Sequence, residues 1–236
     1  MFKRTVEYEE EQQDFFTLSI SDLMAGLLAI FILTICYFIL NFSQATAQLT
    51  QNDVKRTELL ETVYEELSKD GIEVEIDEKH GVLRISEGVL FDVGLADIKP
   101  NGKNVIIKLS TILSNTLQSE QFVDSVETVF IEGHTDNVPI NNGIFPSNWE
   151  LSTKRAINTW LLMKASSHDL EKLKNRNGQL MFSCSGYAES RPIADNGIAD
   201  GRSRNRRIDI RFTMSSPSEE DISIVKFVHG KLKTNE

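Results

Sequence analysis

Hydrophobic residues are concentrated in one segment near the N-terminus, and elsewhere they alternate with polar residues. Residues 23–40 read LMAGLLAIFILTICYFIL and contain no charge. Eighteen helical residues at ~1.5 Å each span about 27 Å, close to the thickness of a bilayer core. This segment predicts a transmembrane helix over 18–42. The sequence has no second run of this length, which predicts a single-pass protein.

The alternative for this segment is a cleaved signal peptide, for which Ala45-Thr46-Ala47 resembles a cleavage site. The apolar run is longer than a typical signal core, and residues 7–14 are acidic where a signal peptide is basic. These features favour an uncleaved anchor. Lys3 and Arg4 precede the span and favour a cytoplasmic N-terminal tail, residues 1–17.

Asp22 lies where the apolar run begins and has two interpretations. Ser19-x-x-Asp22 before an apolar run fits a helix capping box, which position alone favours. A carboxylate inside the membrane costs roughly 2.5–3.5 kcal/mol, so such residues usually carry function.

Residues 43–71 are polar and helix-prone, with apolar positions near helical spacing at Leu49, Leu59, Leu60, Val63, Tyr64 and Leu67. This pattern predicts a solvated amphipathic connector. The alternative is a helix that packs on a partner or blocks a pore beside the membrane.

A regular α/β pattern extends over residues 72–214. Alternating apolar residues on both sides of the turn DEKHG predict a β-hairpin, and Pro100 begins a predicted helix. Residues 126–133 predict a strand. Ser147 and Glu150 form a capping box for a helix that ends near Ala165. Its predicted inward residues are Ile157, Trp160 and Leu161.

Two further strands complete the predicted domain. Leu180, Phe182 and Cys184 alternate in the first, and residues 206–214 form the second. The order predicts a two-layer α/β sandwich, β-α-β-α-β-β with an added hairpin, behind a single transmembrane helix. Residues 215–236 form a tail, in which Ile222, Val225 and Val228 suggest a short amphipathic helix.

The charge balance excludes several classes of protein. The net charge is −10, which argues against direct nucleic-acid binding because phosphate contacts need a basic face. The four histidines and two cysteines have no metal-site spacing, and no G-x-S-x-G sequence occurs. We therefore expect no metal, no cofactor and no enzymatic activity, and a cell-wall hydrolase is only a remote alternative.

Four polar motifs follow one another on this scaffold. Gly133-His134-Thr135-Asp136 ends a strand, LSxxRA begins at Leu151, GYAxxxP begins at Gly186, and RxxNRRI begins at Arg202. Together they resemble the peptidoglycan-binding domain of the OmpA family over residues 82–213. The resemblance implies an OmpA-like fold and a site for the peptide stem of peptidoglycan.

The binding residues of the family have counterparts at matching positions in this sequence. The resemblance implies that Asp136 holds the amine, and Arg155 the carboxylate, of the diamino acid in the peptide stem. Guanidinium–carboxylate pairing is bidentate and directional, which suits this role. Thr135, Leu151, Asn205 and Arg206 match positions that line or support the site.

The sequence NWELSTKRA is similar to the branch of this family found in MotB stator proteins. These have a cytoplasmic tail, one transmembrane helix with an aspartate near its start, and a periplasmic OmpA-like domain. Here Ile20-Ser21-Asp22-Leu23-Met24 keeps the aspartate and the methionine of their signature but lacks its tyrosine and alanine. These departures and the short linker look more like the ZorB subunits of Zorya anti-phage systems.

This resemblance reverses the interpretation of Asp22, which becomes an ion-carrying residue. It implies a homodimer in the bacterial inner membrane, with a periplasmic C-terminal domain, inside a ring of MotA/ZorA-like subunits. The coupling ion implied is the proton, and an aspartate serves sodium equally well. The alternatives are a flagellar MotB-like stator subunit and a passive peptidoglycan-tethering anchor.

Overall fold

The computed structural model describes residues 2–140 and 142–216, and their side chains at 20–43, 52–140 and 142–216. The chain forms two compact units, and the boundary between them falls between Leu49 and Thr50. The predicted helix around Ile222 lies outside the described residues.

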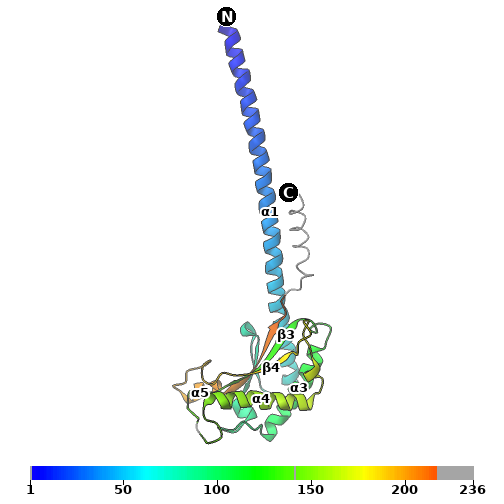
Figure 1. Ribbon diagram of the computed structural model, residues 1–236, viewed down its shortest axis with the longest axis vertical. Coiled ribbons are helices and arrows are strands. Elements are labelled where there is room, and N and C mark those ends of the chain that lie inside the picture. Colours follow the sequence, from blue (N-terminus) through cyan, green and yellow to red (C-terminus); the bar gives the residue numbers. More distant parts are fainter. Residues whose placement is uncertain (1, 141, 217–236) are drawn as a thin grey trace. The chain divides into compact units, whose positions relative to one another are not determined.

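The described residues of the first unit are helical. Helix α1 (Phe2–Lys69) is one unbroken helix that begins in the first unit and ends in the second (Figure 1). Its segment Ile20–Ser43 is long and apolar enough to cross a membrane, and none of the most apolar part is buried within the chain. The capping interpretation of Asp22 is wrong, because Asp22 lies inside α1 and not at a helix start.

The last turns of α1 belong to the core of the second unit. Leu59, Leu60, Val63 and Leu67 are completely buried there among the apolar residues of the sheet and its helices. Lys55 Nζ also donates to Ser125 Oγ at 3.0 Å. The predicted helix is confirmed, but a solvated connector is wrong for its second half, since this face is as buried as any strand of the domain.

The second unit contains a five-stranded sheet in the order β1-β2-β5-β3-β4. Its strands are β1 (Glu75–Asp77), β2 (Val82–Ser86), β3 (Val126–His134), β4 (Phe182–Gly186) and β5 (Arg207–Met214). Only β3 and β4 are parallel, and helix α4 (Asn148–Ser166) connects them as a crossover. The predicted hairpin is the antiparallel pair β1–β2. Leu180, predicted inside a strand, precedes β4 and is exposed.

The remaining helices are short except for α3. Helix α3 (Pro100–Leu117) begins at the predicted proline, while α2 (Glu87–Leu90) and α5 (Ala199–Asn205) are single-turn or two-turn elements. Single 3-10 turns occur at Glu78–His80 and Leu170–Lys172. Helices α3 and α4 lie side by side against the sheet (Figure 1), which confirms the predicted two-layer α/β arrangement.

Helix α4 presents small and polar residues to the sheet. Its buried positions include Ser152, Ala156 and Thr159, whereas Ile157 and Leu161 are exposed and Trp160 is half-buried. The prediction that Ile157 and Leu161 point inward is wrong. The reason is close approach: a Cβ added to Gly133 of β3 would lie 2.0 Å from the backbone oxygen of Ser152, so α4 passes too close for large side chains.

Candidate functional site

A cavity of about 420 Å³ lies at the end of β3, beside the start of α4. Loop residues Val93 and Gly94 form one wall, and Val138, Pro139 and Ile140 form another. The remaining lining residues are polar or come from α4 and α5: Glu87, Thr135, Asp136, Asn148, Leu151, Arg155, Arg202 and Arg206. Five of the six residues predicted to bind peptidoglycan therefore line one cavity.

Asp136 follows β3 and is nine-tenths buried. Its Oδ1 accepts the backbone N–H of Val138 at 3.0 Å, which fixes the carboxylate within the turn. Its Oδ2 accepts Arg206 Nη1 at 2.6 Å. The carboxylate thus lies at the cavity wall with a cation already beside it.

Arg155 reaches the cavity from the second turn of α4 and is only 2% exposed. Its Nε donates to the backbone oxygen of Leu95 at 2.8 Å, and its Nη2 forms an ion pair with Glu87. The guanidinium also lies over the ring of Phe91 at 5.0 Å. Burial lowers the pKa of Arg155, and the neighbouring Glu87 carboxylate opposes that effect. Its Nη1 takes part in none of these hydrogen bonds.

Asp136 and Arg155 are not ion-paired with each other. Arg206 lies between them, because its Nη1 contacts Asp136 and its Nε lies 2.5 Å from Glu87 Oε2. Burial lowers the pKa of Arg206, but the hydrogen bond that Arg206 donates to Asp136 and the charge of Glu87 outweigh this effect and raise the pKa overall. The charges alternate in the order Asp136, Arg206, Glu87, Arg155.

The other predicted residues have supporting positions. Thr135 Oγ1 donates to the backbone oxygen of Asp136 at 2.9 Å. Leu151 belongs to a small apolar cluster with Ala96 and Phe145 beneath the cavity loops. Asn205 does not line the cavity: it is fully buried, and its side chain binds the backbone of Ile193 and Ala194.

Among the lining residues outside the predicted set, two make contacts that hold the site together. Asn148 Nδ2 donates to the backbone oxygens of Asp136 and Val138, at 3.3 and 3.1 Å, and so holds the loop after β3. Glu87 supplies the anion between the two arginines. The one argument that could have pointed to Glu87 is that two buried arginines need a second carboxylate besides Asp136.

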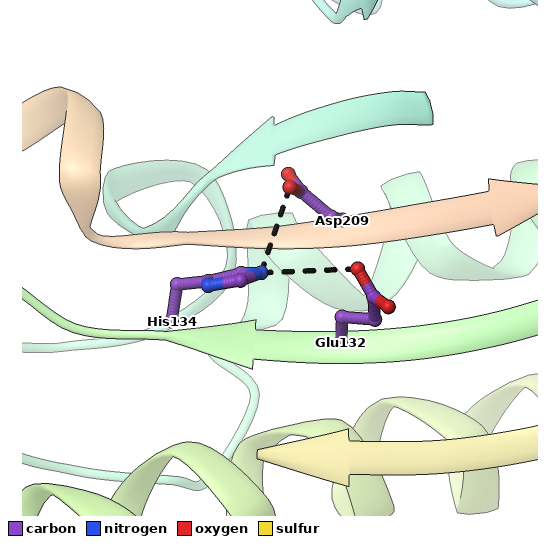
Figure 2. Close-up of side chains that lie close together, drawn as sticks. All are labelled: Glu132, His134 and Asp209. Carbon is purple, nitrogen blue, oxygen red and sulfur yellow. Dashed lines mark ion pairs between the residues drawn. The ribbon is translucent and has the colours of Figure 1, made fainter. Parts of the chain in front are cut away.

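A second group of ionisable residues lies on the sheet, outside the cavity. Glu132, His134 and Asp209 project from β3 and β5 toward one another (Figure 2), and each is at most 2% exposed. His134 Nε2 lies 3.5 Å from Asp209 Oδ2 and 4.0 Å from Glu132 Oε2. Their ligand-type atoms all lie within 4.8 Å of one another.

This group was not predicted, since its members come from two strands far apart in the sequence. Its spacing suits a metal ion, but its charges do not. Arg211 contacts both oxygens of Glu132, and Arg207 contacts both oxygens of Asp209, so each carboxylate is already neutralised. Burial, followed by the charges of nearby arginines, lowers the pKa of His134 to about 3. The same arginines would repel a divalent cation, and the group is best described as a structural charge network.

The domain is similar to known proteins. Residues 90–206 match the model of the OmpA family. Motility protein B of Bacillus subtilis is 32% identical over 154 residues, which cover 65% of this chain and 56% of that protein. The chain spans about half the length of the curated relatives it matches.

Solved structures support the same fold. The cell wall anchor of the T6SS from Pseudomonas aeruginosa has 25% identity and a TM-score of 0.52, covering 66% of this chain and 97% of that one. A MotB-like protein from Desulfovibrio vulgaris has 20% identity and a TM-score of 0.55, covering 71% of this chain and 96% of that one. The chain therefore carries an OmpA-like domain. Its relatives include MotB-like proteins, and the predicted resemblance is confirmed at that level.

Proposed function

We propose that this chain is the wall-anchoring membrane subunit of an ion-driven motor complex. The observation that carries the proposal is the combination of two features on one chain. An acidic residue lies within the apolar part of a helix long enough to span a membrane, and an OmpA-like domain carries a cavity with paired cations and anions.

The cavity has the chemistry of a clamp for a zwitterion. Asp136 offers a carboxylate to an amine, and Arg155 Nη1, which takes part in none of the hydrogen bonds described above, offers a donor to a carboxylate. The diamino acid of the peptidoglycan stem has both groups. The similarity to a T6SS cell wall anchor supports this ligand.

Asp22 provides the proposed ion path. It lies near the start of Ile20–Ser43, a segment whose side chains are exposed within the chain and so available to partner helices. One charge that crosses 100 mV of membrane potential releases about 2.3 kcal/mol, enough for a carboxylate that loads and releases a proton or sodium ion to drive movement.

The complex proposed for this chain is a homodimer inside a ring of MotA/ZorA-like subunits in the bacterial inner membrane. Its N-terminus would be cytoplasmic and its OmpA-like domain periplasmic, so that torque acts against a fixed wall. The departures from the MotB signature around Asp22 favour anti-phage defence of the ZorB type over flagellar motility.

Replacement of Asp22 tests the motor. Asp22→Asn should abolish phage protection, or swimming if the complex is flagellar, at unchanged membrane level, because the amide cannot carry a proton or bind a cation with charge. Asp97→Asn, an exposed loop aspartate, is the matched control and should behave as wild type. The phenotype is scored by plaque counts or swim diameter, with membrane level by immunoblot.

A passive wall anchor is the second candidate, favoured by the same T6SS similarity. It assigns no ion to Asp22. Full activity of Asp22→Asn, with no multi-helix partner co-purifying, would support the passive anchor and refute the motor.

A further inference from the structure

Glu87 connects the two arginines of the cavity. It is the first residue of α2 and is 5% exposed. One of its carboxylate oxygens pairs with Arg155 Nη2, and the other lies 2.5 Å from Arg206 Nε. Both oxygens of one buried carboxylate are therefore used by two different cations.

The backbone of Glu87 is also tied to the same site. Its N–H donates to the backbone oxygen of Arg206 at 3.0 Å, so the start of α2 is bonded to the residue just before β5. A change in the position of the Glu87 side chain would consequently move both guanidinium groups.

Charge makes this connection necessary. The cavity is lined by three arginines, Arg155, Arg202 and Arg206, and by only two carboxylates, Glu87 and Asp136. Without Glu87 the guanidinium groups of Arg155 and Arg206 would repel each other, and both would compete for Asp136. Asp136 would then be less available to the amine of a ligand.

We propose that Glu87 is the positioning residue of this cavity: it orients Arg155 toward a ligand carboxylate and limits Arg206 to one contact with Asp136. This inference rests on the proposed peptidoglycan binding and adds to it a specificity. The cavity should distinguish a diamino acid whose side chain ends in both an amine and a carboxylate from one that ends in an amine alone.

Two peptides measure this specificity. Detergent-solubilised full-length protein is titrated by calorimetry with L-Ala-γ-D-Glu-meso-diaminopimelate and with the same peptide containing lysine. Wild type should prefer the diaminopimelate peptide. Glu87→Gln should bind the diaminopimelate peptide about tenfold more weakly, because one charged hydrogen bond to the orienting anion is lost. Its binding of the lysine peptide should fall by a smaller factor, since that peptide has no carboxylate at the end of its side chain for Arg155 to hold. The exposed Glu61→Gln on α1 is the matched control.

The ratio of the two affinities distinguishes a positioning role of Glu87 from a general loss of folded structure. Loss of structure would weaken the binding of both peptides by the same factor and leave the ratio unchanged. An unchanged ratio in Glu87→Gln would overturn the role of Glu87. If that variant does not fold, Glu87→Asp replaces it; its shorter side chain keeps the charge but reaches one arginine, and an unchanged ratio there has the same meaning.

Arg155→Ala distinguishes this failure from failure of the proposed function. Loss of binding in Arg155→Ala with normal binding in Glu87→Gln leaves peptidoglycan binding standing and refutes only the inference. If wild type and Arg155→Ala bind equally well, or both fail to bind, the proposed peptidoglycan binding and the inference about Glu87 are both refuted.

Discussion

Neighbouring residues of the GHTD motif have different roles because their side chains point to different sides of the sheet. His134 lies on the polar face beneath arginines, Asp136 reaches the cavity, and Gly133 faces α4. Neither ring nitrogen of His134 has a hydrogen-bond partner within the described part of the chain. This residue is therefore held neutral, and its role is structural.

A neutral buried histidine makes stability depend on pH. The folded pKa of His134 is about 3, below the 6.5 of an exposed histidine, so the unfolded chain binds a proton that the folded chain does not. The stability contributed by His134 is complete above pH 6.5 and is lost as the pH falls toward 3. Between pH 7.5 and 5.5, the free energy of unfolding of wild type should fall by about 1 kcal/mol more than that of His134→Gln.

Urea unfolding followed by tryptophan fluorescence measures this difference, because Trp149 and Trp160, the two tryptophans of the chain, both lie in α4. Carboxylates titrate in both wild type and His134→Gln, so their effect cancels when the two pH profiles are compared. Parallel pH profiles for the two proteins would show that His134 is not held neutral.

Motifs predicted the cavity residues that belong to a family pattern, and they missed the residue that connects them. Asp136, Arg155 and Arg206 lie in recognisable sequences and line one cavity. Glu87 is an isolated glutamate whose role depends on a contact with an arginine 68 positions later. Such long-range charge pairing leaves no local pattern.

At the scale of elements, the end of α1 is the main departure from the predicted organisation. Leu59, Leu60, Val63 and Leu67 follow helical spacing, which a solvated amphipathic connector and a core helix share. Periodicity identifies the apolar face of a helix but not what covers it. Helix α4 has the opposite property: the glycines of β3 and β4 let it approach closely at Ser152, where its inner face is small and polar, and its apolar Ile157 and Leu161 are exposed.

The core position of α1 predicts where the domain can be cut. Four fully buried aliphatic side chains contribute roughly 6–12 kcal/mol, comparable to the whole stability of a domain. A fragment of residues 50–216 should fold, and one of residues 72–216 should be unfolded or melt far lower. Thermal melts followed by circular dichroism compare the two.

Leu59→Ala in the fragment of residues 50–216 provides an intermediate case. We expect it to lower the free energy of unfolding by about 2–5 kcal/mol. Exposed Val54→Ala is its matched control and should have little effect. Equal melting temperatures for the two fragments would mean that α1 is not part of the core.

At the scale of the whole molecule, the two proposed activities lie in different compact units. Asp22 belongs to the first unit, and the cavity belongs to the second. Wall binding should therefore not depend on Asp22, whereas the proposed motor function should need both Asp22 and the cavity. The overall sequence predicted this division, since its one long apolar run and its α/β pattern are separate in the chain.

Sedimentation with purified peptidoglycan tests the central claim most directly. Detergent-solubilised full-length protein is mixed with sacculi, and the bound fraction is measured by immunoblot. Wild type and Asp22→Asn should sediment with the wall to the same extent, while Asp136→Ala and Arg155→Ala should stay in the supernatant, with at least tenfold weaker binding. Equal sedimentation of all four proteins would contradict the assignment of this cavity as the peptidoglycan clamp.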